Sequence, residues 1–188
     1  MSYTSQSLSF SENKITYIDT NIDVEWEVMM DWEDPLMSAS AAYICEGGGD
    51  ILEIGFGMGI SANYIQQHTI NSHTIIENHP DMIPKAQAWA ADKSNVTIVE
   101  GSWYDIKDIL STYDGLFMDT FGDQDRDKFS ESLSSLMKEG GKATWWNSTT
   151  GSDNYYGISD VTYDVYDVTP PTNNYFNYSQ YYLPKKQF

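Results

Sequence analysis

Cysteine is almost absent from the chain, and positively charged residues are few. The single cysteine, Cys45, excludes a disulfide within the chain and favours a reducing compartment. Ten Lys and Arg stand against 28 Asp and Glu, which gives a formal net charge of −18. Binding of nucleic acid depends on a basic surface that neutralises phosphates, so no nucleic-acid partner is expected. A small cation would instead be attracted by the overall field.

Long apolar runs are also lacking. No run approaches the length that crosses a membrane, and the N-terminus has no charged-then-apolar signal pattern. We therefore expect a cytoplasmic protein without a membrane partner. The 188 residues suffice for one domain with its own core. We expect an N-terminal arm and helical lid over 1–45, an α/β core over 46–150 and a C-terminal hairpin over 151–188.

The N-terminal part has two expected elements. Residues 1 to about 20 are rich in Ser, Thr and Asn, and they predict an irregular arm with one short strand around 14–17. The segment 24–45 predicts a helix, because its apolar side chains recur at helical spacing. Pro35 should begin a second helix there or kink the first.

The middle of the chain alternates between strand and helix patterns. Strands are predicted at 50–54, 73–77, 96–100, 113–119 and 142–146, and helices at 60–67, 82–91, 104–110 and 127–138. Such alternation indicates a parallel sheet covered on both faces. Beyond Thr150, the alternating segments 161–169 and 175–183 flank the turn PPTNN and predict an antiparallel hairpin that closes the sheet.

The stretch DILEIGFGMGIS joins the first of these strands to a helix through three glycines, Gly55, Gly57 and Gly59. Glycine permits a tight turn and lets a ligand approach the backbone. Glu77 ends the next strand, where a carboxylate can accept hydrogen bonds from ribose hydroxyls. A P-loop would need a GKS or GKT ending, which this chain lacks. A dinucleotide fold would favour G-x-G-x-x-G, whereas the glycines here follow G-x-G-x-G. The third nucleotide ligand that fits, S-adenosylmethionine (SAM), carries ribose and adenine without phosphate.

Five stretches in order along the chain match one family. They are VMMDWEDPLM (Val28–Met37), ILEIGFGMGIS (Ile51–Ser61), HTIIEN (His73–Asn78), GSWYD (Gly101–Asp105) and LFMDTF (Leu116–Phe121). With these motifs the chain resembles class I SAM-dependent methyltransferases, and within them guanidinoacetate N-methyltransferase and the protein arginine δ-N-methyltransferases. The resemblance implies a Rossmann-like α/β fold with a mostly parallel seven-stranded sheet, closed by an antiparallel hairpin and shortened near the C-terminus.

The resemblance also implies how the donor is bound. SAM would be the methyl donor and S-adenosylhomocysteine the product. Glu77 would hold the ribose, and Ser102 and Trp103 would bound the adenine. The full set of residues expected to bind the cofactor is Met30, Met37, Glu53, Gly55, Gly57, Gly59, Glu77, Asn78, Ser102, Trp103 and Asp119.

The acceptor side follows from the same resemblance. Glu33 and Asp119 match the two acidic residues that grip a guanidino group, and two carboxylates suit the forked geometry of that cation. Asp119 is expected to accept the proton and Glu33 to orient the substrate. The remaining residues expected on the substrate side are Phe121, Asn147, Ser148 and Thr149. Phe121 and the segment WWNSTT depart from the family pattern, so methyl transfer is better supported than guanidinoacetate as acceptor.

The partners expected from this reasoning are a small cationic substrate and, at most, a second copy of the chain in a homodimer. The substrate would carry a guanidino or amino nitrogen. Alternatives are a protein arginine acceptor, or a protein that binds or degrades SAM without methyl transfer. His68, His73 and His79 do not have metal-ligand spacing, and the chemistry requires no metal.

Overall fold

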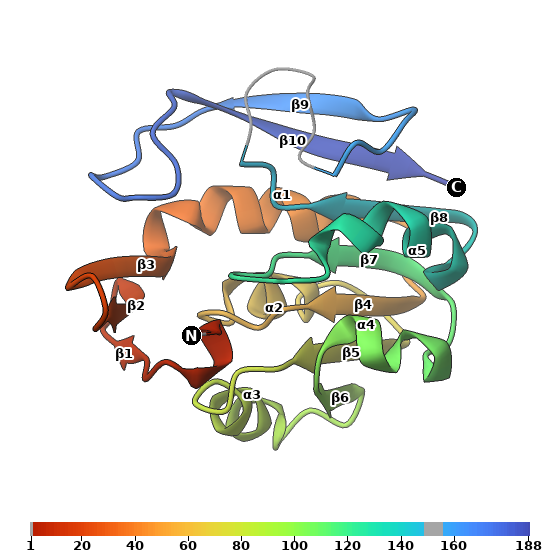
Figure 1. Cartoon of the computed structure of the whole chain (residues 1–188). Helices are drawn as coiled ribbons and strands as arrows, with labels where there is room; N and C mark the ends of the chain where they lie inside the picture. The colour runs from red at the N-terminus through yellow and green to blue at the C-terminus, as the bar shows by residue number, and fades with distance from the viewer. Residues whose placement is uncertain (1, 149–155) are drawn as a thin grey trace.

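Two β-sheets are formed by the residues that the computed structural model describes, 2–148 and 156–188 (Figure 1). The larger sheet has seven strands in the order β6-β5-β4-β7-β8-β10-β9. These strands are β4 (Asp50–Ile54), β5 (Ser72–Glu77), β6 (Val96–Glu100), β7 (Tyr113–Met118), β8 (Met137–Trp145), β9 (Thr162–Asp167) and β10 (Gln180–Gln187). The smaller sheet consists of β1 (Ser9–Phe10), β2 (Lys14–Asp19) and β3 (Val24–Met30).

The larger sheet is the one predicted from the alternating pattern. Strands β6, β5, β4, β7 and β8 are parallel, whereas β10 runs antiparallel to both β8 and β9. The mostly parallel seven-stranded α/β sheet with its closing antiparallel hairpin is therefore confirmed. Within the described part of the chain, no helix combines the length and the apolar character needed to cross a membrane.

Helices cover both faces of the larger sheet. The α-helices are α1 (Asp34–Ile44), α2 (Ile60–Ile65), α3 (Ile83–Ala90), α4 (Trp103–Ile106) and α5 (Phe129–Leu136); short 3-10 helices are η1 (Tyr3–Ser5), η2 (Asp31–Glu33), η3 (Lys107–Ile109) and η4 (Arg126–Lys128). Alternate side chains of each strand point to opposite faces. On β4, Ile51 belongs to the core beneath α1, whereas Leu52 and Ile54 belong to the core beneath α4 and α5.

The segment before α1 differs from the prediction. Residues 24–30 form strand β3 rather than the first part of a helix, and β3 pairs antiparallel with β2. The sequence VEWEVMM has β-branched and aromatic side chains at every second position as well as helical spacing, and pairing with β2 selects the strand. Pro35 lies in the first turn of α1, as expected. The three-stranded sheet lies beside the carboxyl ends of the parallel strands (Figure 1).

The C-terminal strands are shifted from their predicted bounds. Strand β8 begins at Met137, directly after α5, instead of at residue 142. Strand β10 begins at Gln180 instead of at residue 175, because Asn173 Oδ1 accepts the backbone N–H groups of Tyr175 and Phe176 and so forms a turn there. The first strand of the hairpin, β9, lies within its predicted segment.

Candidate active site

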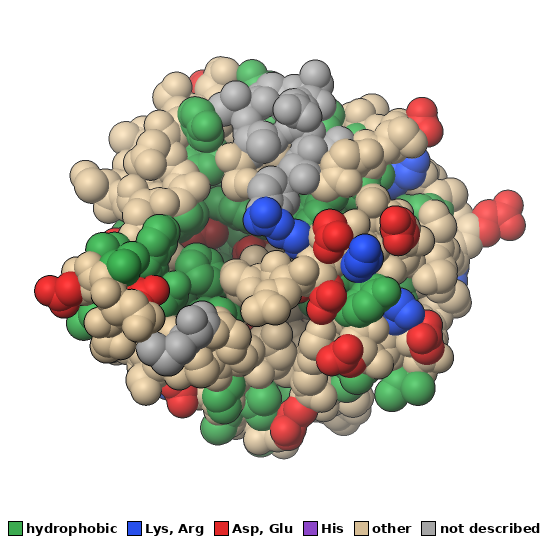
Figure 2. Space-filling view, viewed as in Figure 1, with side chains coloured by type: hydrophobic (Ala, Val, Ile, Leu, Met, Phe, Trp, Pro, Cys, Tyr) green, Lys and Arg blue, Asp and Glu red, His purple; other side chains and the backbone are tan. Residues whose placement is uncertain are grey.

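A cavity of about 260 Å³ lies at the carboxyl ends of β4, β5 and β7. Each of these strands contributes to its wall through the residue that follows or ends it: Gly55, Glu77 and Asp119. Parallel sheets place ligand sites at this edge. Figure 2 shows the hollow between the N-terminal and C-terminal parts of the chain, with hydrophobic and basic side chains at its rim and acidic groups inside.

The glycine loop forms one wall of the cavity. Gly55 and Gly57 have φ angles of 94° and 52°, values that a side chain disfavours. A Cβ at Gly55 would overlap the backbone oxygen of Asp119, and a Cβ at Gly57 would overlap the thioether of Met29. The backbone N–H of Met58 donates to that same Met29 Sδ at 3.2 Å. The loop is therefore closely packed against Asp119 and Met29, and Gly55 and Gly57 line the cavity.

Glu77 is fixed by backbone donors. Its Oε2 accepts the N–H of Phe56 at 3.0 Å, and its Oε1 accepts the N–H groups of Asn78 and His79, each at 2.8 Å. The side chain is buried, yet it borders the cavity. The carboxylate is therefore held in one orientation between β5 and the glycine loop, and its remaining lone pairs can accept hydroxyl groups.

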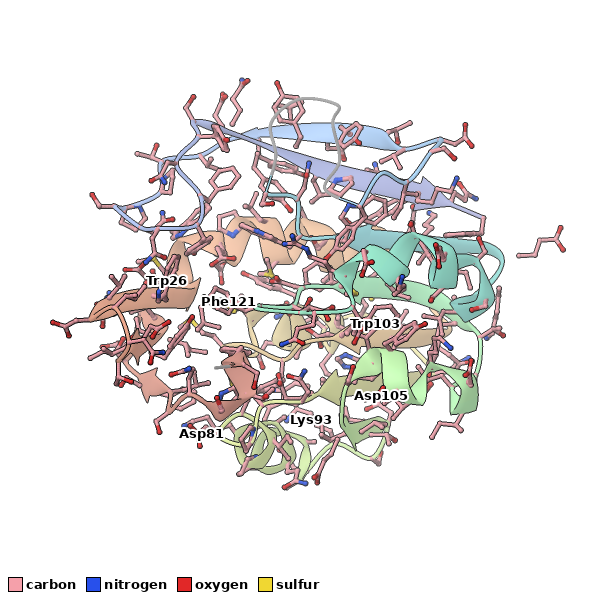
Figure 3. The ribbon with its side chains drawn as sticks, in the orientation of Figure 1. Trp26, Asp81, Lys93, Trp103, Asp105 and Phe121 are labelled. Atoms are coloured by element: carbon pink, nitrogen blue, oxygen red, sulfur yellow. The ribbon has the colours of Figure 1, made fainter. Side chains whose placement is uncertain are left out.

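Aromatic rings enclose the part of the cavity next to Glu77. The ring of Tyr3, from the N-terminal arm, lies 5.1 Å from the ring of Phe121 and 4.6 Å from that of His79, measured between centroids. Trp103 borders the cavity from α4, and its Nε1 donates to Asp123 Oδ2 at 2.7 Å. Phe121 belongs to the loop after β7, and Trp103, at the start of α4, contacts the same loop through Asp123 (Figure 3). Flat apolar walls of this kind suit a nucleobase.

Two carboxylates, Glu33 and Asp119, border the opposite part of the cavity. Glu33 is 3% exposed; its Oε1 accepts the N–H of Met30 at 2.8 Å and the hydroxyl of Tyr175 at 2.5 Å. Burial, with the charge of Asp119, raises the pKa of Glu33 to about 8. Burial, with the charge of Glu53, raises the pKa of Asp119 to about 7. Both groups therefore favour a bound cation that offsets their charge.

The charges on the cavity wall are of one sign. Among the described residues that line it, the charged side chains are Glu33, Glu77 and Asp119. A positively charged ligand is therefore matched electrostatically, and an anionic one is opposed.

Aromatic side chains from distant parts of the chain surround Glu33. Tyr175 and Trp146 line the cavity, and Trp32 packs behind them. The rings of Trp32 and Phe176 are stacked at 5.7 Å with an interplanar angle of 29°. Tyr3, Met29, Tyr156 and Tyr175 line the cavity although the sequence did not predict them there. For Tyr156 and Tyr175 the available signal was the accumulation of eight of the fourteen tyrosines beyond residue 150.

The structure brings most of the predicted site residues together. Those that line the cavity are Glu33, Gly55, Gly57, Glu77, Asn78, Trp103, Asp119, Phe121 and Ser148. Those that the structure places elsewhere are Met30, Met37, Glu53, Gly59, Ser102 and Asn147. Thr149 lies outside the described residues. The binding and catalytic roles of all these residues remain predictions.

The residues placed elsewhere have identifiable structural contacts. The carboxylate of Glu53 is fully buried beneath the loop, where it bonds Ser61 Oγ and His73 Nε2. Asn147 is also buried, and its Nδ2 donates to the backbone oxygen of Tyr182 at 2.9 Å. Glu53 and Asn147 therefore make hydrogen bonds within the protein and do not line the cavity.

Comparison with known proteins gives related sequences and related folds. The family model described as guanidinoacetate N-methyltransferase matches residues 6–154. The protein arginine N-methyltransferase 2 of Aspergillus fumigatus is 34% identical over 174 residues, covering 87% of this chain and 38% of its own. That of Kluyveromyces lactis is 36% identical over 152 residues, covering 74% of this chain and 36% of its own.

Solved structures of low sequence identity share the fold. Spermidine synthase from Thermotoga maritima superposes with a TM-score of 0.64 at 11% identity, covering 96% of this chain and 72% of its own. Precorrin-6y C5,15-methyltransferase from Geobacter metallireducens superposes with a TM-score of 0.62 at 12% identity, covering 84% of this chain and 87% of its own. These matches confirm the Rossmann-like methyltransferase fold.

The extent of the matches differs between the two kinds of comparison. The chain spans less than two fifths of the length of the two curated relatives described above. The family model, in contrast, matches most of the chain, including the glycine loop, Glu33 and Asp119. The chain therefore belongs to the guanidinoacetate N-methyltransferase family of methyltransferases.

Proposed function

We propose that the chain transfers a methyl group from SAM to a guanidinium nitrogen, and that the acceptor is the arginine side chain of a protein. The observation that carries the proposal is the carboxylate pair of buried Glu33 and half-buried Asp119, which line the same cavity as the glycine loop.

The residues next to Glu77 fit SAM. The fixed carboxylate of Glu77 would accept the ribose hydroxyls, and the aromatic wall of Tyr3, Trp103 and Phe121 would enclose the adenine. Gly55 and Gly57 keep the loop free of side chains where the methionine part would lie. Bound SAM supplies a methyl group activated on a positively charged sulfur.

The carboxylate pair would act on the acceptor. Two carboxylates can bind a guanidinium through several hydrogen bonds and fix one nitrogen toward the methyl group. That nitrogen forms a bond to the methyl carbon as the bond from carbon to sulfur breaks, and it must release one proton. Asp119, with a pKa raised to about 7, is suited to accept this proton near neutral pH, while Glu33 holds the rest of the cation.

Sequence similarity favours a protein acceptor. The curated relatives at 32–36% identity over most of this chain are named protein arginine N-methyltransferase 2. An arginine side chain would enter as a cation on an uncharged linker, which agrees with a cavity whose described charges are all acidic. A small guanidino compound is the second candidate, and it is favoured by the family model named for guanidinoacetate.

The test compares acceptors under the same conditions. Release of S-adenosylhomocysteine from SAM would be measured with arginine-containing peptides, a protein substrate mixture, guanidinoacetate, agmatine and no acceptor, and products would be identified by mass. We expect peptide-dependent release, with methylation localised to arginine. Turnover with guanidinoacetate alone would favour the second candidate. SAM binding without any acceptor-dependent release would contradict methyl transfer by this chain.

A further inference from the structure

The loop between β9 and β10 places a tyrosine at the carboxylate pair. The hydroxyl of Tyr175 donates to Glu33 Oε1 at 2.5 Å and accepts the indole N–H of Trp32 at 3.0 Å. This chain of hydrogen bonds joins two segments that are more than 140 residues apart in sequence. Tyr175 also lies beyond residue 154, where the match to the family model ends. The family match therefore gives no information about its role.

The loop is held so that Tyr175 keeps this position. Asn173 Oδ1 accepts the N–H of Tyr175 at 3.0 Å, which closes a tight turn just before the tyrosine. Asn174 then bonds to strand β3: its Nδ2 donates to the backbone oxygen of Glu25 at 2.8 Å, and its N–H donates to Glu27 Oε2 at 3.2 Å. The C-terminal loop is thereby attached to the strand that leads into Glu33.

The two oxygens of Glu33 have different surroundings. Oε1 accepts both the N–H of Met30 and the hydroxyl of Tyr175, whereas no described residue donates to Oε2. Resting on the function proposed above, we propose that Tyr175 is a positioning residue: its hydroxyl, oriented by Trp32, fixes Glu33 through Oε1 and leaves Oε2 for the guanidinium of the acceptor. Loss of the hydroxyl would free the carboxylate to rotate and would remove a donor that favours its charged form.

Ionisation of Glu33 gives a readout of this contact. The groups that face Glu33 are Asp119 after β7, Tyr175 in the loop and Tyr181 on β10. Burial and the charge of Asp119 raise the pKa of Glu33, and the hydrogen bonds from Tyr175 and Met30 oppose that rise. Burial, with the charge of Glu33, raises the pKa of Tyr175 far above neutrality, so its hydroxyl remains a donor.

The experiment measures the pKa of Glu33 by NMR titration of its carboxyl carbon, with Glu33→Gln used to assign the signal. Tyr175→Phe removes the hydroxyl and keeps the ring. Trp32→Phe removes the indole donor while keeping a smaller aromatic ring at this position, and it remains informative if Tyr175→Phe fails to fold. Tyr64→Phe is the matched control, because its hydroxyl donates to an exposed carboxylate, Asp34 Oδ1, at 2.8 Å.

We expect Tyr175→Phe to raise the pKa of Glu33 by about one pH unit, as loss of one hydrogen bond to a charged group should do. Trp32→Phe should give a smaller rise, and Tyr64→Phe none. In each variant, the acidic limb of the kcat/KM profile should shift by as much as the pKa of Glu33 shifts in that variant. SAM affinity should stay constant. An unchanged pKa of Glu33 in Tyr175→Phe, or in Trp32→Phe where only that variant folds, overturns the assignment.

The titration requires no acceptor, so its outcome is separate from that of the proposed function. A raised pKa in the variants of a chain that methylates nothing would support the role of Tyr175 at Glu33 and contradict methyl transfer. Normal methyl transfer with an unshifted pKa would support the function and overturn the positioning role.

Discussion

The position that a side chain on Gly55 would occupy is filled by the backbone oxygen of Asp119. The N–H of Asp119 also donates to the backbone oxygen of Ile54 at 2.9 Å. The start of the glycine loop and the end of β7 are thus in direct backbone contact. This contact fixes the glycine loop, where we propose that SAM binds, relative to the carboxylate of Asp119.

Replacement of Gly55 should therefore be far more harmful than replacement of a glycine in open space. Gly140 has a φ of 78°, yet a Cβ there would meet nothing within 4 Å. Gly140→Ala should lower the free energy of unfolding by about 1 kcal/mol from backbone strain alone. Gly55→Ala should add about 1–3 kcal/mol from overlap and should weaken SAM binding. Urea unfolding and calorimetry test this; equal losses in both variants would contradict it.

Glu77→Gln should weaken SAM binding. The amide that replaces the carboxylate must direct a donor group toward backbone N–H groups that now point at Glu77, and it loses the charge that strengthens hydrogen bonds to ribose. We expect a loss of about tenfold or more in affinity, measured by calorimetry. Glu100→Gln is the control, because Glu100 ends the neighbouring strand and bonds Gln87 on the exposed surface. Unchanged affinity in Glu77→Gln would contradict the ribose assignment.

Asp119→Asn should abolish methyl transfer, because the amide cannot accept the proton released by the guanidinium. SAM affinity should change by less than about threefold, since the proposed contacts to ribose and adenine are made by other residues. A coupled assay for S-adenosylhomocysteine, together with calorimetry, measures both quantities. Full turnover by this variant would exclude Asp119 as the proton acceptor.

The same substitution should stabilise the fold at alkaline pH. The pKa of Asp119 in the folded protein is about 7, whereas an exposed Asp ionises near pH 3.9. Between these values the folded state holds the proton more tightly, so the free energy of unfolding falls as pH rises. Asp119→Asn removes that cost: we expect a melting temperature several degrees higher at pH 8 and little change at pH 4. Asp108→Asn, at an exposed site, is the control substitution.

Activity should increase with pH through the neutral range. Glu33 and Asp119 must both be charged to bind a guanidinium, and burial raises their pKa values to about 8 and about 7. Because kcat/KM reports ionisations of the free enzyme, it should rise from pH 6 through about pH 8 with a slope between one and two, and level off about one pH unit above the higher pKa. A flat profile over this interval would show that the pair is already ionised in the free protein.

The central sheet was predictable because strand and helix patterns were both strong there. The strand Asp50–Ile54, the glycine loop and Glu77 follow one another with spacings that leave few alternatives. Segment 24–30 was not predictable in the same way, since VEWEVMM satisfies both periodicities and only pairing with β2 selects the strand. Local sequence carries no information about such a partner.

The acceptor side of the cavity was only partly predictable. Glu33 and Asp119 lie in recognisable motifs, whereas Tyr175 reaches Glu33 through a loop whose path depends on the contact of Asn174 with β3. Glu53 shows the opposite case: the family resemblance implies that it binds SAM, whereas in the structure its carboxylate is buried and bonds Ser61 and His73. Orientation of a side chain in the tertiary structure decides both cases.

The acidic wall of the cavity also affects how long the folded chain persists. With the cavity empty, Glu33 and Asp119 repel each other, and this repulsion favours unfolding above neutral pH. A cation bound between them would remove that repulsion, and any ligand specific to the folded state shifts the folding equilibrium. Resistance to proteolysis should therefore follow the concentration of the acceptor, so that the amount of protein surviving in a protease-rich environment depends on the supply of its own substrate.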